Sequence, residues 1–157
     1  MSYELRAMIT AVDLAKVVAA EVPTARVIGL AQGLALIPMT DQLYDTVADP
    51  ERPALPGFTH FPGGFGHRLG AWSQAGPIAY VEAEYFGGVG SQCAAVWLDG
   101  KIDFGPIGTG EPSRAPLIDT PISQALRRLG AQKADRGDEF DAVGLLRHRH
   151  LTDWLVG

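Results

Sequence analysis

The chain has 157 residues, of which 46% are hydrophobic and 20% charged, and it carries a net charge of −5. This length fits one domain with one contiguous core, which we expect to span residues 1–157. The sequence contains no apolar run near the roughly 18 residues that suggest a membrane span. Its acidic balance also provides no broad basic face for phosphate backbones, so neither a membrane nor a nucleic acid is an expected partner.

Composition and cysteine usage indicate the compartment. The N-terminal segment MSYELRAMITAVD lacks the basic end and the long apolar stretch of a secretory signal. The single Cys93 cannot form an internal disulfide, and its strand-like surroundings favour a buried structural thiol. We therefore expect a cytoplasmic protein. Arginine outnumbers lysine and asparagine is absent, which favours a bacterial source with GC-rich codons.

The first forty residues predict a strand, a helix and a hairpin. Apolar and polar residues alternate from Tyr3 to Ile9, as they do in a strand with one buried face. Thr10 and Asp13 resemble a capping pair for a helix that should end before Pro23. Two apolar runs then flank Gln32-Gly33, a pattern typical of a hairpin.

A short helix, a long loop and a second helix are expected between residues 40 and 76. Thr40 can cap the first of these helices. Residues 49–64 are dense in proline and glycine, which excludes regular helix or central strand. The phenylalanines of this loop should pack onto the body of the domain. Phe65, Leu69 and Trp72 then recur at the spacing of an amphipathic helix.

The periodicity changes to two at Ile78. One face of this strand would carry Ala79, Val81, Ala83 and Tyr85, and the other Tyr80, Glu82 and Glu84. The strand from Gln92 to Leu98 is apolar on both faces, which is typical of a central strand, so Trp97 should be largely buried. Asp99-Gly100 predicts a type I′ hairpin turn. That turn would pair Leu98 with Lys101, Trp97 with Ile102 and Ala95 with Phe104, and would build one apolar face from Cys93, Ala95, Trp97, Ile102 and Phe104.

The C-terminal part should contain a second long loop at residues 105–119, then a helix and a short helical tail. Thr120-Pro121 is a good helix start, and Gly130 ends that helix. Two helical turns are expected around residues 140–145 and 152–155. The fold class that follows is α+β, with a mainly antiparallel sheet that contains a β-meander in its C-terminal half and packs against several short helices.

Glu82 and Glu84 are the most informative pair of side chains. Two residues apart on one strand, their Cα atoms should lie about 6.5 Å apart. Three interpretations stay open: the solvent face of a half-exposed sheet, an acidic surface for a partner, and catalysis or metal binding. Paired carboxylates in acid/base or glycosidic chemistry lie about 5 to 9.5 Å apart, which this spacing permits. Their expected direction is away from the main core.

Other possible sites are incomplete. The glycine-rich residues 86–91 match no phosphate-binding motif and precede a strand, so a hairpin loop is the simpler interpretation. His148 and His150 alternate, but they and His60 and His67 lack recognised metal-ligand spacing, so neither metal nor other cofactor is expected. Cys93 has no defined base nearby in sequence, and the serines lack a nucleophile motif.

The segments AYVEAEYFGGVGSQCAAVW and DEFDAVGLLRHRHLTDWL resemble segments of a family of small bacterial proteins with no named activity. This resemblance implies no catalytic residues. In size and acidic charge the chain is also similar to immunity proteins of bacterial toxin systems, a likeness of class that does not fix function.

The sequence thus predicts a non-enzymatic cytoplasmic protein-binding module, with an immunity-type inhibitor of a basic toxin or enzyme as one form. The expected binding residues are Tyr80, Glu82, Glu84, Phe86, Arg147 and His150. The alternative is a small hydrolase or lyase that uses Glu82 and Glu84, with His148 as a further catalytic candidate. A third possibility is a structural subunit that forms a homodimer through its sheet edge.

Overall fold

The structure is a computed structural model that describes residues 2–87, 89–109, 113–114 and 119–156. Its strands are β1 (Ser2–Ala11), β2 (Ile28–Gly29), β3 (Leu34–Pro38), β4 (Ile78–Phe86), β5 (Val89–Leu98), β6 (Lys101–Gly108) and β7 (Ser113–Arg114). Its α-helices are α1 (Val12–Glu21), α2 (Asp41–Val47), α3 (Phe65–Trp72), α4 (Pro121–Arg128) and α5 (Glu139–Ala142). The described residues also form three 3-10 helices: η1 (Ser73–Ala75), η2 (Leu145–Arg147) and η3 (Leu151–Leu155).

The strands form one antiparallel sheet in the order β2-β3-β1-β4-β5-β6, and β7 pairs with the start of β5. The meander predicted for the C-terminal half is present as β4, β5 and β6, each paired with the next along the chain. The predicted α+β class is confirmed. Among the described residues, none of the helices combines the length and the apolar character needed to cross a bilayer.

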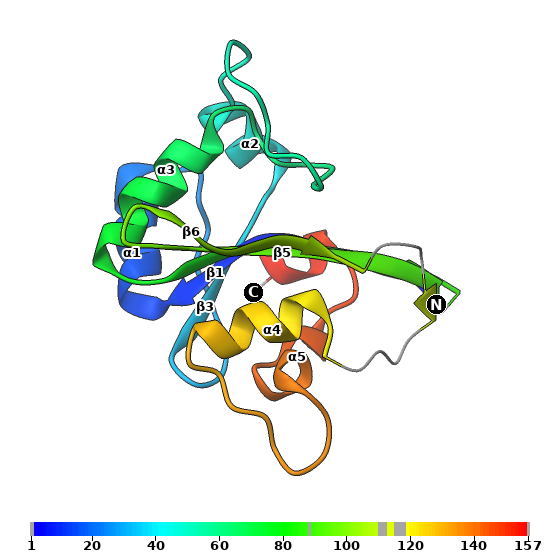
Figure 1. The fold of residues 1–157 in the computed structure, drawn as a ribbon. Coiled ribbons are helices and arrows are strands. Elements are labelled where there is room, and N and C mark those ends of the chain that lie inside the picture. The colour runs from blue at the N-terminus through cyan, green and yellow to red at the C-terminus, as the bar shows by residue number, and fades with distance from the viewer. Residues whose placement is uncertain (1, 88, 110–112, 115–118, 157) are drawn as a thin grey trace.

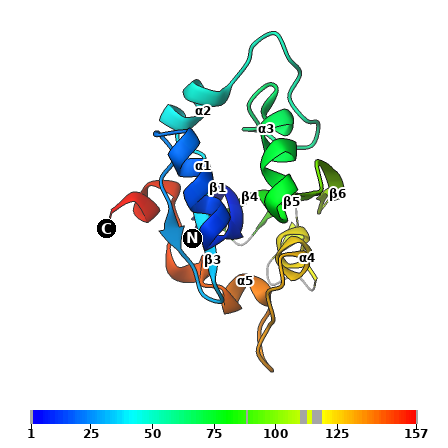
Figure 2. The ribbon, with the colours of Figure 1, turned by 90° about the vertical axis from the view of Figure 1, so that its left-hand side faces the viewer.

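Helices cover both faces of the sheet, so the domain has two apolar layers. On one face, α1, α2 and α3 pack over side chains that include Met8, Tyr80 and Trp97 (Figure 1). On the other face, α4 and the C-terminal helical turns pack over the alternating residues Ala79, Val81 and their neighbours. The same division is visible after a quarter turn of the molecule (Figure 2). The two-residue alternation predicted for β4 is therefore confirmed, although helices or loops cover both of its faces along most of its length.

The β5–β6 turn follows the predicted hairpin geometry, but the pairing shifts beyond it. Asp99 and Gly100 have φ of 54° and 87°, as a type I′ turn requires. Trp97 is 3% exposed and lies opposite Ile102, as predicted. The predicted pairing of Ala95 with Phe104 is wrong, because a bulge places Phe104 opposite Val96.

That bulge also changes the predicted apolar face of the hairpin. Phe104 packs with the layer under α4, whereas Ala95 and Trp97 belong to the layer under α3. A bulge inserts one residue into one strand, and the side chains beyond it point to the opposite face. The alternation of the sequence alone did not indicate it.

Two of the three predicted helix starts are confirmed. The Thr40 and Thr120 hydroxyls accept hydrogen bonds from the backbone N–H groups of Leu43 and Ser123. The predicted cap by Thr10 is wrong, because β1 continues to Ala11 and the Thr10 hydroxyl donates to the Pro77 carbonyl at 2.8 Å. The strand geometry holds Thr10 too far into the sheet to cap α1.

The proline-rich loop packs onto the sheet as predicted, and this packing positions the site described below. Phe58 meets the Tyr80 ring edge-on at 5.0 Å, and Phe61 stacks on Trp97 at 6.0 Å. Phe61 also contacts Phe65 at the start of α3. These aromatic contacts hold residues 58–61 against the first half of β4.

The second predicted loop begins later than expected. β6 continues through Gly105 and Pro106 to Gly108, which pairs with Cys93. Proline is tolerated there because β6 is paired on one side only in the described sheet order. Residues 110–112 and 115–118 of the predicted loop lie outside the described part of the chain.

Candidate functional site

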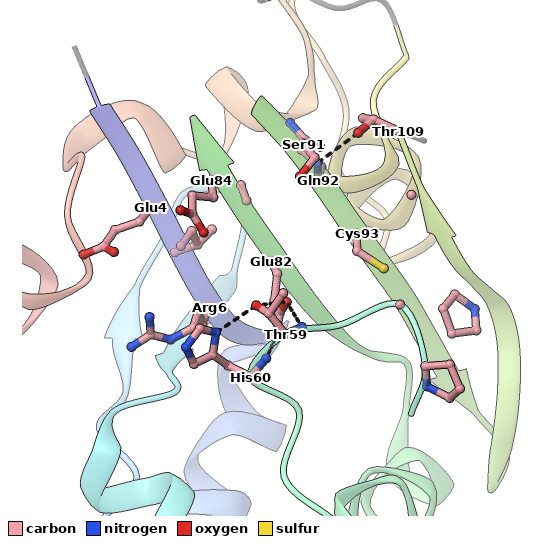
Figure 3. Close-up of a pocket in the computed structure, with 16 residues that line it drawn as sticks. Glu4, Arg6, Thr59, His60, Glu82, Glu84, Ser91, Gln92, Cys93 and Thr109 are labelled. Carbon is pink, nitrogen blue, oxygen red and sulfur yellow. Dashed lines mark hydrogen bonds between the residues drawn. The ribbon is translucent and has the colours of Figure 1, made fainter. Parts of the chain in front are cut away.

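A pocket of about 330 Å³ lies between strands β1, β4 and β5 and the part of the proline-rich loop at residues 56–60, which we call the covering loop. Its polar lining includes residues from the sheet and from the loop at residues 56–60 (Figure 3). The charged and hydrogen-bonding side chains on the β1 and β4 side are those of Glu4, Arg6, Thr59, His60, Glu82 and Glu84. Ser91, Cys93 and Thr109 contribute on the β5 and β6 side.

Strand register brings these side chains together. Glu82 pairs with Arg6 on one neighbouring strand and with Cys93 on the other. One step further out, Glu84 pairs with Glu4 and with Ser91. Residues that pair directly across an antiparallel sheet point to the same face. The end of the face under α3 therefore carries two polar rows, where the apolar layer of Tyr80 and Trp97 stops.

Glu82 is a buried carboxylate whose two oxygens are both occupied. It is 7% exposed. Its Oε1 accepts from the Thr59 backbone N–H at 2.7 Å and from the Thr59 hydroxyl at 3.0 Å. Its Oε2 accepts from the His60 backbone N–H at 2.8 Å. Consecutive N–H groups of the loop thus hold the carboxylate, and the carboxylate holds the loop on the sheet.

Tyr80 also helps to attach the loop to the sheet. Its hydroxyl lies 2.8 Å from the His60 carbonyl and 3.0 Å from Glu82 Oε2, and its single proton can serve one of them at a time. Burial and then the charge of Glu82 raise the pKa of Tyr80 well above its ordinary value. Tyr80 is 0% exposed, so its expected role in direct partner contact is wrong: the covering loop fills that face.

Glu84 differs from Glu82 because the loop stops short of it. Glu84 is exposed, and it faces the pocket beside Glu4 (Figure 3). The next residues on the same face, Phe86 and Val89, pair with each other at the hairpin tip and are 81% and 40% exposed. The expectation that both acids point away from the core holds for Glu84 and is wrong for Glu82.

Cys93 lies inside the pocket wall as a protonated thiol. A side-chain carbon built on Gly57 would lie 3.5 Å from its sulfur, so the loop passes directly over it. Burial, followed by the negative charge of Glu82, raises the pKa of Cys93 to about 11. A thiol with that pKa is a weak nucleophile at neutral pH.

Arg6 supplies the positive charge in the pocket lining. Its Nε is buried and has no hydrogen-bond partner within the described residues. Among the described residues of the lining, the carboxylates of Glu4, Glu82 and Glu84 accompany this one guanidinium. The net charge of these lining residues is therefore negative when His60 is neutral.

The C-terminal basic run approaches the site without lining it. The N–H of Glu4 donates to the Arg149 carbonyl at 2.7 Å, so the run follows the outer side of β1. Arg147 donates to the Gly29 carbonyl, and His148 meets the Trp154 ring edge-on at 4.7 Å. Arg147, His148 and His150 are absent from the pocket lining. The structure thus does not bring these three predicted residues together with Glu84.

On the β1 and loop side of the pocket, sequence reasoning missed Glu4, Arg6, Thr59 and His60. Glu4 and Arg6 alternate on a predicted strand, so their shared face was readable, but their position beside β4 was not. Thr59 and His60 lie between aromatic residues of an irregular loop, and no periodic signal fixes the direction of such a segment.

The chemistry available at the site is hydrogen bonding and charge. Within the described residues, no group of three or more histidine, cysteine, aspartate or glutamate side chains is arranged to hold a metal ion. Comparison of the chain with protein-family models, curated protein sequences and solved structures finds no match. The inference of function therefore depends on the geometry of the pocket and its rim.

Proposed function

We propose that this chain is a protein-binding module whose pocket receives a basic side chain of a partner protein. The observation that carries the proposal is the exposed Glu84, which faces an acidic pocket beside the exposed Phe86. A carboxylate next to an accessible aromatic ring can hold a cationic side chain and bury the apolar surface around it.

The hairpin tip supports a protein as the ligand. Phe86 is 81% exposed and Val89 lies opposite it, so the tip presents an apolar contact next to the charged row. Aromatic anchors surrounded by polar groups are typical of the residues that dominate binding energy in protein interfaces. A small molecule that filled only the pocket would leave Phe86 uncovered.

Arg6 complements such a partner. Arg6 lines the pocket, and its guanidinium carries several N–H donors. A peptide segment carries backbone carbonyl acceptors as well as side-chain charge. We therefore favour a basic residue in an exposed segment of the partner, with the side chain toward Glu84 and a main-chain carbonyl toward Arg6. A basic toxin or enzyme inhibited by this chain is one partner of that kind.

The geometry supports the hydrolase or lyase alternative less well. Both oxygens of Glu82 already accept hydrogen bonds from the loop, so Glu82 is not free to attack a substrate or take its proton. The raised pKa of Cys93 keeps that thiol protonated. The pair of Glu82 and Glu84 that the alternative names is therefore not available for acid/base chemistry.

The proposal is tested by placing a photo-crosslinking amino acid at Val89 and, in a separate variant, at Val17 on α1, which is 49% exposed. Each bait is exposed to extract of the host cell, and the protein captured is identified and purified. Binding is then measured with Phe86→Ala and with Leu146→Ala, the latter a truncation of a 60% exposed residue remote from the pocket lining.

We expect Val89 to capture a protein that Val17 does not, and Phe86→Ala to weaken its binding while Leu146→Ala leaves it unchanged. Loss of an aromatic hot spot typically costs at least ~2 kcal/mol. Equal binding by the two variants would refute the proposed surface. Turnover of a small substrate that disappears with Glu84→Gln would instead support the enzymatic alternative.

A further inference from the structure

The loop that Glu82 holds also contains a histidine whose protonation pattern the structure determines. The Thr59 hydroxyl lies 3.0 Å from Glu82 Oε1 and 2.8 Å from His60 Nδ1 (Figure 3). One hydroxyl therefore connects a buried carboxylate to an exposed imidazole. The backbone N–H groups of the same two loop residues also bind Glu82, which fixes the geometry of this connection.

The number of available protons decides which group donates and which accepts in the hydrogen bonds that link Glu82, Thr59 and His60. An ionised carboxylate only accepts hydrogen bonds, so the contact with Glu82 uses the single proton of the Thr59 hydroxyl. The hydroxyl can then interact with His60 only as an acceptor. His60 Nδ1 must donate to it, which places the ring proton of neutral His60 on Nδ1 and leaves Nε2 with a free lone pair.

We propose that Glu82, acting through Thr59, holds His60 in the Nδ1–H form, so that Nε2 is a hydrogen-bond acceptor for a guanidinium or ammonium group in the pocket. This inference rests on the proposed function, since it assigns a specificity role at the same site. Glu82 and Thr59 are then positioning residues, and His60 carries the acceptor at the pocket wall.

The hydrogen-bonding groups of the pocket lining support selectivity for a cationic group. Glu84 and Glu4 are acceptors when ionised, and an Nε2 lone pair adds a third acceptor on the loop side. A guanidinium carries five N–H donors in a fixed fork and can donate to separate acceptors at the same time. Arg6 opposes any cation, but its one charge faces three carboxylates in the lining.

The ring-proton position is measurable without any partner. Nitrogen-detected or long-range 1H–15N NMR of the full chain distinguishes protonated from unprotonated ring nitrogens, and a His60→Asn variant identifies the His60 signals. Spectra are recorded at about pH 8.5, where an imidazole is ordinarily neutral. Thr59→Val removes the hydroxyl and retains the backbone N–H, whereas Thr59→Ser keeps both and serves as the matched control.

We expect Nδ1–H in the parent and in Thr59→Ser, and loss of this preference in Thr59→Val. An Nε2–H ring in the parent, or an Nδ1–H ring that persists in Thr59→Val, would overturn the proposal that Glu82 fixes the ring proton of His60 through Thr59. Either result would leave the proposed protein-binding function standing, because crosslinking at Val89 tests that function separately.

Selectivity is tested with N-acetyl-arginine methylamide as the probe and N-acetyl-glutamine methylamide as its uncharged counterpart, both titrated while the His60 and Glu84 signals are followed. We expect the arginine probe to bind preferentially, and Thr59→Val to weaken it about tenfold, the value of one hydrogen bond to a charged donor. Unchanged affinity in Thr59→Val, together with a changed ring-proton position, would refute the specificity role and leave only a structural one.

Discussion

Glu82 and Glu84 lie two residues apart on the same face of β4, yet Glu82 is 7% exposed and hydrogen-bonded whereas Glu84 is exposed at the pocket. The boundary between them is the edge of the covering loop, whose Thr59 and His60 N–H groups bind Glu82. The first acid therefore organises the site, and the second is available for a ligand.

This difference predicts opposite results for matched substitutions of the two acids. Glu82→Gln replaces one acceptor oxygen by an amide that meets a donor, and we expect it to cost about 1–3 kcal/mol of unfolding free energy. Glu84→Gln should stay within about 0.5 kcal/mol of the parent. Urea unfolding monitored by tryptophan fluorescence measures both. Equal stability of the two variants would contradict the role of Glu82 as the attachment of the loop.

Trp97 provides a test of the core on the same face. It is 3% exposed, and Phe61 of the loop stacks on it. Trp97→Ala should lower the free energy of unfolding by about 3–5 kcal/mol, because truncation leaves a cavity between the sheet and the loop. Phe86→Ala is the matched control, since Phe86 is 81% exposed. A thermal melt of Trp97→Ala that coincided with the parent would refute the position of Trp97 in the core.

Local patterns were sufficient for much of the fold. The alternation from Ile78 to Tyr85 correctly assigned side chains to the two faces of β4, and Asp99-Gly100 correctly predicted the hairpin turn. The bulge that moves Phe104 was not predictable, because it depends on how β6 meets both its partner and the layer under α4.

The site was less predictable than the fold. Alternation placed Glu82 and Glu84 together correctly, but it could not show that one of them is covered. Thr59 and Glu82 are 23 residues apart in sequence. Their contact is set by the tertiary packing of Phe58 and Phe61 in a loop with no repeating pattern. Charge and spacing alone therefore overestimated the accessible acidic surface.

Cys93 should react slowly with alkylating agents while the chain is folded. Burial and the charge of Glu82 raise its pKa to about 11, so at pH 8 only about one thiol in a thousand is the reactive thiolate. The rate with iodoacetamide should rise about tenfold per pH unit up to that pKa. Mass spectrometry measures it, with the urea-unfolded chain as the reference. A folded rate equal to the unfolded rate at pH 8 would contradict the covered thiol.

The same raised pKa has a consequence for stability with a defined sign. The folded state favours the protonated thiol, so this contribution is complete below the ordinary pKa of 9.0 and is lost as the pH rises through about 11. Cys93→Ala should therefore lose less stability than the parent between those two pH values. Equal losses of stability in the two proteins would show that other groups control the stability at alkaline pH.

The salt dependence of partner binding tests the charge of the pocket. In the parent, Glu84 and Glu4 should attract a basic partner before contact, and rising salt should slow association because the Debye length is only about 10 Å at 0.1 M. Glu84→Gln removes one exposed charge and should reduce the slope of association rate against salt concentration. Asp135→Asn removes an exposed charge that is absent from the pocket lining and serves as the control.

The comparison requires the partner captured through Val89 and stopped-flow measurements of association over a range of salt concentrations. We expect Asp135→Asn to keep the slope of the parent more closely than Glu84→Gln does. Dissociation should change less than association in Glu84→Gln, if Phe86 provides most of the buried contact, because charges at an accessible rim act mainly on the encounter. Equal slopes for Glu84→Gln and Asp135→Asn would show that net charge alone, and not the pocket, attracts the partner.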